Sequence, residues 1–538
     1  MSESTRAGGP ALNLARNCAL LLCLFAPSVW MIATIPPLWR DVDAYSQLTL
    51  RPLVTTFWGH APAYSYLAKV PLFLGEQLER WRGIAGARAE SGLPQLTDTG
   101  VWLLIGAQHL ALGAAAFYFI LSISRVFWIR LALAVTWASN ALFYTFAHCT
   151  GSETLSVVVV ILLVTKGLRL VRSRSEPRWV DWYLFAIVLC LCLLSRHANV
   201  WLILLLPAAF ILSWAHYRVA GLFASSAPRR RRRRLRAKHL RQAVIALAIG
   251  IACFGVANSW MQYVARKTKL HPHSRIGHTL MWRLQFLKTL PPPERAALLQ
   301  KVEARTYSPE TRRLLTLLGQ MHEEGGEVVG RPFMQRAAVI LFPSETSIPW
   351  ERLDLAVNKM AYAFLLPPTR EHWQVARSEF LAALKMSGTE IPDWLLSTTA
   401  YFFDHKDEMP ACAKLVTFRD HTAESIIQIP ERYPYFHLRR GLSYNKAFLI
   451  WLGSLLLLIV IARRKKKNVG AIPALGIALI AIGLLMTLSA CLVTEFLPRY
   501  ALPMWQLLLL SLYIFVGAAA DLMVNRKEKS AGQLPKLG

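Results

Sequence analysis

The sequence predicts an all-α integral membrane protein with about ten transmembrane helices and a mainly helical extracytoplasmic region. Hydrophobic residues make up 54% of the 538 residues and charged residues only 17%, and the mean hydropathy is +0.35. The apolar residues are gathered into blocks close to the roughly 20 residues that a helix needs to cross a bilayer core. The short basic loops between these blocks fall on one side of the resulting topology. A soluble chain of this length would show neither feature.

Ten apolar blocks are expected to be membrane spans. The fifth and the eighth are shorter than the lower limit of about 17 residues for a crossing helix. The first is too long, and too closely followed by a structured loop, to be a cleaved signal peptide. The predicted spans are residues 18–38, 101–122, 126–147, 155–171, 181–195, 198–216, 242–264, 447–462, 470–492 and 500–524.

The distribution of positive charge predicts the orientation. The formal net charge of +29 raises nucleic-acid binding as a function class. With the N-terminus in the cytoplasm, however, every short basic loop lies inside, which is the positive-inside pattern of membrane proteins. The run Arg229–Arg234 is then a topology anchor that also meets anionic lipid, and no signature of nucleic-acid binding accompanies it. The other inner basic residues are Arg125, Arg130, Arg172, Arg174, Arg178, Arg463, Arg464, Lys465, Lys466, Lys467, Arg526, Lys527 and Lys529.

The chain divides into two membrane modules around one large soluble region. Residues 1–264 hold seven spans and the first outer loop, 39–100, whereas residues 446–538 hold three spans and a short cytoplasmic tail. Residues 265–445 lie between them on the outer side. Pro292 stands where an amphipathic helix is expected to begin, and the region is predicted to be mainly helical and to cover the outer cavity.

Two carboxylates follow the first span closely. Asp41 and Asp43 stand two residues apart, directly after an apolar run that ends near Pro37. A carboxylate is costly within hydrocarbon and much less so just outside it, where it can still reach a lipid head group. Such a group can act as a general base for an acceptor hydroxyl. The pair can also coordinate Mg²⁺ or Mn²⁺, although the sequence does not require a metal.

Two short outer connections carry further charged side chains. Glu153 begins the fourth span, where it either caps the helix N-terminus or faces the same cavity as Asp43. Arg196 and His197 lie on a connection with almost no loop between the fifth and sixth spans. They either snorkel to lipid phosphate or clamp the phosphate of a substrate. The sequence leaves both alternatives open.

The last outer connection adds Glu495 and Arg499, so that charged residues from four connections meet at one membrane face. This combination suits transfer of a group away from a phosphate. A carboxylate takes the proton of the acceptor, and arginines hold the leaving phosphate as its charge grows. A sugar linked to a lipid phosphate fits, because its tail lies in the bilayer and its head group lies at the outer surface.

The order of these motifs resembles the GT-C superfamily of membrane glycosyltransferases, in particular the protein mannosyltransferase and aminoarabinose transferase type. The resemblance covers most of the membrane part and little of residues 265–445. It rests on Asp41-Val42-Asp43-Ala44-Tyr45, His60-Ala61-Pro62-Ala63-Tyr64, Gly151-Ser152-Glu153 and Pro498-Arg499-Tyr500-Ala501-Leu502-Pro503.

The resemblance implies a polyprenyl- or dolichyl-phosphate-linked sugar as the donor and a lipid, glycan or protein as the acceptor. It implies that Asp43, in an Asp-small-Tyr pattern, is the base or positions the acceptor, in preference to Asp41. Many relatives carry consecutive prolines where this chain has Ala61-Pro62, so the sugar stays open. The expected phosphate-binding residues are Arg196, His197 and Arg499, supported by Glu153, His60, Glu495 and Tyr500.

Other function classes stay open at this point. A transporter or flippase for lipid-linked substrates would show broken spans and a repeat between the two halves, and neither is visible in the sequence. An O-antigen-ligase or polymerase-like transferase would place its chemistry on Arg and His of residues 265–445, and an assembly module would not need the membrane charges. The favoured interpretation predicts a multi-pass protein of a bacterial inner (plasma) membrane, active in the cell envelope, with its site facing the periplasm. Membrane lipids, but no nucleic acid, are its expected partners.

Overall fold

The protein is built almost entirely from α-helices. The computed structural model describes residues 10–40, 61–84, 95–173, 176–223, 229–268, 281–325, 331–345, 348–365, 368–410, 412–437, 441–465, 471–494 and 496–524. Within these residues, eight helices are long and apolar enough to cross a membrane. This is the architecture of a multi-pass, all-α membrane protein, as the sequence predicts.

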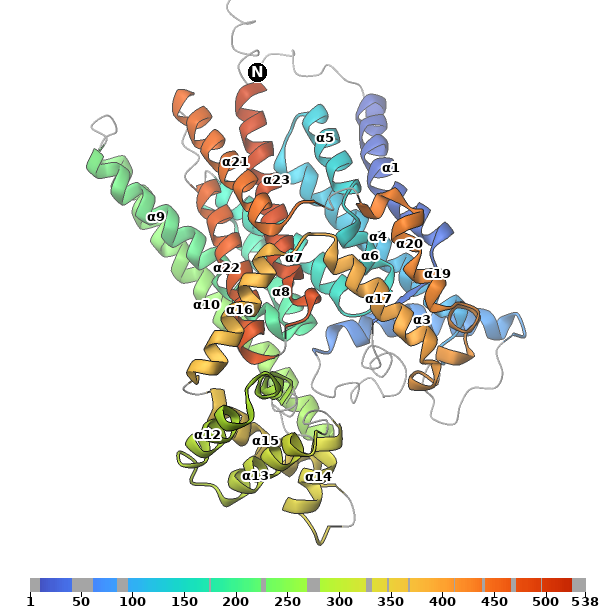
Figure 1. Cartoon of the computed structure of the whole chain (residues 1–538). Helices are drawn as coiled ribbons and strands as arrows, with labels where there is room; N and C mark the ends of the chain where they lie inside the picture. The colour runs from blue at the N-terminus through green and yellow to red at the C-terminus, as the bar shows by residue number, and fades with distance from the viewer. Residues whose placement is uncertain are drawn as a thin grey trace, which may run out of the picture.

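The long helices run roughly parallel to one another as a bundle (Figure 1). Two of the predicted spans correspond to shorter helices, α5 (Phe127–Ala138) and α8 (Trp179–Ser195). The long spans are α1 (Pro10–Thr34), α4 (Asp98–Ile123), α7 (Glu153–Arg172), the 3-10 helix η2 (His197–Leu204) continued by α9 (Leu205–Phe223), α10 (Arg229–Thr268), α21 (Tyr444–Arg464), α22 (Ala471–Val493) and the 3-10 helix η7 (Pro498–Ala501) continued by α23 (Leu502–Val524).

The predicted span 126–147 is one broken helix. α5 ends at Ala138, and α6 (Ala141–Ala147) begins after a two-residue turn. The side chain of Asn140 accepts a hydrogen bond from the amide of Leu142 and so caps α6, which is a preferred role of asparagine. Such a break is tolerated at membrane depth because its backbone groups find partners inside the protein: the hydroxyl of Tyr435 donates to the carbonyl of Ala138.

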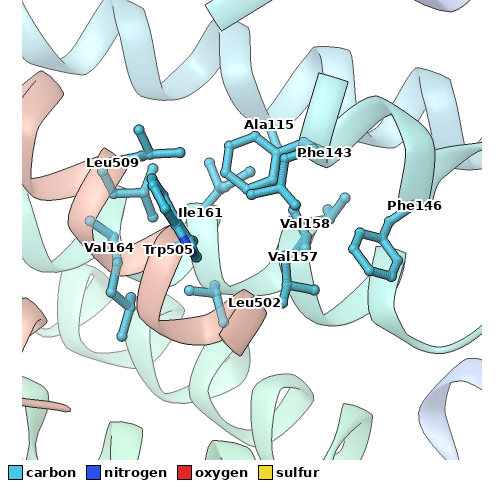
Figure 2. Packing of buried hydrophobic residues seen from close by; sticks show 14 of the residues in the cluster. Ala115, Phe143, Phe146, Val157, Val158, Ile161, Val164, Leu502, Trp505 and Leu509 are labelled. Carbon is cyan, nitrogen blue, oxygen red and sulfur yellow. The ribbon is translucent and has the colours of Figure 1, made fainter. Parts of the chain in front are cut away.

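The core of the bundle lies between α4, α6, α7 and α23. Figure 2 shows Ala115, Phe143, Val157 and Trp505 from these helices in one packed layer. These side chains are buried, so the contacts between helices are protein–protein rather than protein–lipid. The side-chain amide of Gln506 in α23 donates to the carbonyl of Val157 in α7, which ties the two helices in register.

Two short parallel strands join the ends of α1 and α6. β1 (Leu38–Trp39) pairs with β2 (Cys149–Thr150), with Leu38 opposite Cys149 and Trp39 opposite Thr150. The hydroxyl of Thr399 in α17 (Glu390–Asp404) bonds to both the amide and the carbonyl of Trp39. The backbone directly before Asp41 is therefore held by β2 and α17 together. We call this end of the bundle, where α1 ends and α7 begins, the site face.

The helix α3 (Ala63–Trp81) crosses the bundle at the site face (Figure 1). Its polarity is the reverse of that of a soluble surface helix. Lys69, Glu76 and Glu79 are buried against the protein, whereas apolar side chains such as Leu67 and Trp81 are exposed. A helix of this kind presents its apolar face to lipid.

The region after α10 contains two groups of helices with different cores. Residues 281–365 pack around a core of their own, and Figure 1 shows α12–α15 beyond the site face of the bundle. This group, here called the module, contains the 3-10 helix η3 (Leu284–Thr289), α12 (Pro292–Glu303), α13 (Pro309–Glu323), α14 (Arg331–Leu341) and α15 (Trp350–Leu365).

The second group returns to the bundle. Buried side chains from residues 383–436 belong to the same core as the membrane helices, so this segment is part of the bundle at the site face. It begins with α16 (Arg370–Lys385) and α17. The short elements that follow are η4 (Lys406–Glu408), η5 (Cys412–Lys414), α18 (Val416–Arg419), α19 (Ala423–Ile427), α20 (Ile429–Arg432) and η6 (Pro434–His437).

Candidate functional site

Four of the residues that the sequence singles out come together at the site face. Glu153 and Arg196 form an ion pair, and Arg499 and Tyr500 lie beside them on η7. The remaining predicted site residues, Asp41, Asp43, His60 and Glu495, lie outside the described residues. His197 is described and exposed at the start of η2.

The closest partner of Glu153 is Arg40. One guanidinium nitrogen of Arg40, Nη1, donates to both carboxylate oxygens of Glu153, at 2.6 and 2.7 Å. Both side chains are almost fully buried, with 5% and 1% of their surface exposed. A buried carboxylate needs such a charged partner, because the cost of removing it from water is high.

The pairing of β1 with β2 explains how Arg40 reaches Glu153. Trp39 lies opposite Thr150, so the next residues along each strand, Arg40 and Gly151, are neighbours. A Cβ atom on Gly151 would stand 2.9 Å from Oε2 of Glu153 and 3.4 Å from Cδ of Arg40. The Gly151-Ser152-Glu153 motif thus needs a glycine at its first position to let these two side chains meet.

Arg196 approaches the same carboxylate from the connection between α8 and η2. Its Nη1 atom lies 3.6 Å from Oε1 of Glu153, and 16% of its side chain is exposed. Burial lowers the pKa of the Arg196 guanidinium, and the nearby Glu153 carboxylate opposes that shift. The backbone of Arg196 is extended, between the end of α8 and the start of η2.

Asn199 holds this connection in place. Its side-chain amide contacts the carbonyl of Cys192 and the hydroxyls of Ser195 and Ser156, at 2.9, 3.0 and 3.0 Å. These partners belong to α8 and α7. Because the asparagine is buried, its contacts fix the backbone on both sides of Arg196 against α7, which also carries Glu153.

Arg499 completes the cluster from η7. Its guanidinium carbon lies 5.4 Å from the centroid of the Trp394 ring of α17 and 5.3 Å from that of Tyr500. Its positive charge acts on Glu153 together with those of Arg40 and Arg196. Aromatic faces of this kind hold a guanidinium in place without neutralising its charge.

Counted over the described residues, the cluster carries an excess of positive charge. Three guanidinium groups surround Glu153, and as a carboxylate it balances one of their three charges. Arg196 and Arg499 are partly exposed, whereas Arg40 is buried. An arginine group of this composition is suited to bind an anion such as a phosphate, for which the planar guanidinium offers paired donors.

Two buried histidines, His109 and His148, support β1 and β2 from inside the bundle. Nε2 of His148 lies 2.9 Å from the carbonyl oxygen of Ile35, which can only accept, so this nitrogen carries the proton. Nδ1 of His148 lies 3.1 Å from Nε2 of His109, and Nδ1 of His109 lies 3.0 Å from the hydroxyl of Ser28. When both imidazoles are neutral, Nδ1 of His148 accepts from Nε2 of His109, and Nδ1 of His109 accepts from Ser28.

Gln108, the residue before His109 in α4, supports β2. Its amide nitrogen donates to the carbonyls of Ala147 and Cys149, at 3.1 and 3.0 Å, and its oxygen accepts from the hydroxyl of Tyr64, at 3.1 Å. The polar pair Gln108–His109 thus positions the strands that lead to Arg40 and Glu153.

Sequence reasoning missed Arg40 and Asn199 as site residues. Arg40 is visible in the sequence only as a charge next to Asp41, and Asn199 only as a polar residue at the start of a span. Their roles depend on contacts across 113 and 43 residues of chain. Within the described residues, no three His, Cys, Asp or Glu side chains are grouped as ligands for a metal ion. The predicted metal pair, Asp41 and Asp43, lies outside these residues.

No protein-family model matches the sequence, and no curated protein is significantly similar to it.

Proposed function

We propose that this protein is a membrane glycosyltransferase that moves a sugar from a polyprenyl-phosphate-linked donor to an acceptor at the extracytoplasmic face. The observation that supports this most is the arginine cluster. Arg196 and Arg499, together with Arg40, surround one carboxylate at the end of the membrane bundle. A lipid-borne phosphate is an anion that is held by its tail at this depth.

The proposed reaction forms a bond between the acceptor oxygen and the anomeric carbon of the sugar, and it breaks the bond from that carbon to the phosphate oxygen. The acceptor proton passes to a base, for which we propose Asp43. The phosphate leaves with the electron pair and gains negative charge. Fixed guanidinium groups stabilise this growing charge more than that of the bound donor, which is the condition for catalysis.

The motifs that resemble the GT-C superfamily lead to the same proposal. Gly151-Ser152-Glu153 and Pro498-Arg499-Tyr500 contribute to one cluster in the structure, although they are more than 300 residues apart in the sequence. The acceptor class, the sugar, the divalent cation at Asp41 and Asp43, and the location in a bacterial inner membrane with the site facing the periplasm are parts of this proposal. The proposal also gives Asp43 a larger role than Asp41.

The first test replaces the two partly exposed arginines. Arg196→Ala and Arg499→Ala are each expected to lower kcat/KM for the donor by roughly ten- to a hundred-fold, the loss of a charged hydrogen bond. Lysine should restore only part of it, because the paired donors are lost. Lipids that co-purify with the protein, identified by mass spectrometry, name the donor for the assay. Arg178→Ala, at an exposed arginine, is the control, and unchanged donor affinity in both site variants would contradict the phosphate role.

The second test addresses the base. Asp43→Asn keeps the shape of the side chain and removes its basicity, so turnover should fall by about a hundred-fold or more. Asp41→Asn should cost less, unless the two carboxylates share a metal, in which case both variants lose activity and chelators inhibit. The assay is transfer from the radiolabelled donor, with expression and thermal stability of each variant measured alongside. Near-normal transfer by a folded Asp43→Asn protein would favour the ligase-like alternative.

A further inference from the structure

The half of α10 nearest the site face carries an open groove. Its volume is about 570 Å³, and the described residues that line it all belong to α10. The large side chains here are exposed: Val256, Trp260 and Tyr263 have 60%, 39% and 46% of their surface uncovered. In a helix that crosses a membrane, such side chains face lipid. The groove residues are Ala252, Gly255, Val256, Ser259, Trp260 and Tyr263.

Small residues make the floor of this α10 groove, and aromatic residues flank its end nearest the site face. Ala252, Gly255 and Ser259 recur at spacings of three and four, which places them on one side of the helix. A Cβ atom added to Gly255 would find no atom of the described residues within 4 Å. None of the side chains that the structure describes therefore fills this hollow. On its flank, the ring of Trp260 meets that of Tyr66 in α3, with centroids 6.2 Å apart.

The length of the groove matches one leaflet of a bilayer. From Ala252 to Tyr263 the helix rises roughly 16 Å at 1.5 Å per residue. The hydrocarbon core is about 30 Å thick, so one leaflet contributes about 15 Å. A single acyl chain that lies along the groove would fill it from the bilayer centre to the interface.

Two cations stand at the interfacial end. Arg266 and Lys267 follow the groove in the last turn of α10, and both are exposed. Nζ of Lys267 lies 5.8 Å from the centroid of the Tyr263 ring. An apolar channel of one leaflet's length that ends in positive charge is complementary to a lipid with an apolar chain and an anionic head group.

We infer that the α10 groove is a binding site for one anionic phospholipid from the bilayer leaflet at the site face. Its acyl chain lies on Gly255 between Ala252 and Ser259, and its phosphate lies against Arg266 and Lys267. The bilayer lipid is favoured over the proposed donor because the groove includes none of the arginine-cluster residues. By covering Trp260, the lipid also contacts the side of α3 that carries Tyr66.

Filling the groove tests the chain site. Full-length protein is purified, supplied with phosphatidylglycerol or phosphatidylcholine, and examined by native mass spectrometry for retained lipid. The wild type should retain one phosphatidylglycerol in preference to phosphatidylcholine. Gly255→Leu should reduce this retention by about ten-fold or more, because about two methylene groups of the acyl chain would no longer be buried against α10. The matched control is Gly453→Leu in α21, since Gly453 is also exposed and without neighbours, and it should retain lipid as the wild type does.

Neutralising the charged end tests the head-group site. Arg266→Gln combined with Lys267→Gln should abolish the preference for phosphatidylglycerol over phosphatidylcholine while chain binding remains. Equal retention by wild type and Gly255→Leu, or no preference between the two lipids in the wild type, would overturn the inference. Displacement of the phosphatidylglycerol by stoichiometric polyprenyl phosphate would assign the groove to the donor tail instead. None of these results depends on sugar transfer, so the proposed enzyme activity can fail while this site stands.

Discussion

At the scale of single residues, Glu153 and Arg40 define the candidate site. They form a buried ion pair with two short hydrogen bonds, and the guanidinium groups of Arg196 and Arg499 also act on the Glu153 carboxylate. In such a pair the desolvation cost of each charge is high, and the partner offsets it. The pair therefore contributes less to net stability than its short distances suggest, and its removal is costly only when one partner is left alone.

Single and double variants of this pair should differ in how much stability they lose. Glu153→Leu alone leaves the Arg40 charge buried, and it should lower the free energy of unfolding by about 3–5 kcal/mol. Arg40→Met together with Glu153→Leu should recover most of that loss but not the donor affinity. Thermal unfolding of the purified protein measures the stability of both variants.

The matched control is an exposed pair. Arg241 and Glu176 lie 2.9 Å apart with 64% and 71% of their side chains exposed, and Arg241→Met should change stability by less than about 1 kcal/mol. A double Arg40/Glu153 variant no more stable than Glu153→Leu alone would mean that the pair is required for the fold itself.

The sequence could place Glu153, Arg196 and Arg499 at one membrane face, because sidedness follows from hydropathy and basic loops. It could not pair Glu153 with Arg40. That contact depends on the register of two-residue strands and on the space left by Gly151, and neither leaves a periodic pattern in the sequence.

At the scale of elements, the crossing of α3 over α4 depends on two glycines. A Cβ atom on Gly75 would stand 2.2 Å from the Cα atom of Gly100, so the two backbones are in direct contact. This crossing brings Tyr64 of α3 to Gln108 of α4, and Gln108 in turn holds β2. The helix at the membrane surface is thus linked to the strands of the site.

Gly75→Ala should force the two helices apart. We expect a loss of stability of about 1–3 kcal/mol, typical of overpacking, and a lower transfer rate because β2 loses support. Gly106→Ala in α4 is the control: its Cβ meets no atom within 4 Å, and alanine should raise helix stability by about 0.5–1 kcal/mol. Thermal unfolding and donor turnover are measured for both. Similar changes in the two variants would show that the close crossing does not matter.

The broken span bears on the transporter alternative, because broken spans are typical of transporters. The sequence predicts residues 126–147 as one continuous span, and the break after Ala138 is a correction to that expectation. Asn140 is a residue type preferred at helix N-caps, which indicates the break, but the apolar run around it predicts a single span. The cavity beside the break is only about 20 Å³. That is room for about one water molecule, so this cavity is too small for a lipid-linked head group.

At the scale of the whole molecule, residues 265–445 do not behave as one unit. The amphipathic helices of this region are visible in the sequence, and α12 begins at the predicted Pro292. The pattern says which face of a helix is buried but not which core receives it. In the structure, the module (281–365) keeps its own core, and residues 383–436 join the core of the bundle.

One buried side chain connects the two parts. Arg283, with 1% of its side chain exposed, donates through Nη1 to Glu379 of α16 at 2.6 Å and to the carbonyl of Thr494 at 3.3 Å. Close by, Nε2 of His372 donates to the carbonyl of Leu492, at 3.0 Å. The module is therefore fixed to the end of α22, next to the connection that carries Arg499.

The stability of the module should depend on pH through Asp354. This carboxyl group of α15 is 4% exposed, and burial raises its pKa from 3.8 to about 7. The folded module binds the proton more tightly than the unfolded chain, so the stability that Asp354 contributes is highest below about pH 4 and falls as the pH rises towards 7. Asp354→Asn removes the ionisable group. It should stabilise the module at pH 8 by on the order of 2–4 kcal/mol and leave it nearly unchanged at pH 4.

Hydrogen exchange of the amides of α15 in the full-length protein measures this difference, with wild type and variant compared at each pH. The control is Glu303→Gln, at an exposed carboxylate of α12, which should not change exchange at either pH. An equal effect of Asp354→Asn at pH 4 and pH 8 would show that the side chain acts through packing and not through its charge. A difference confined to high pH would show that protonation of one buried carboxyl group stabilises the module, in a part of the molecule that lies apart from the arginine cluster.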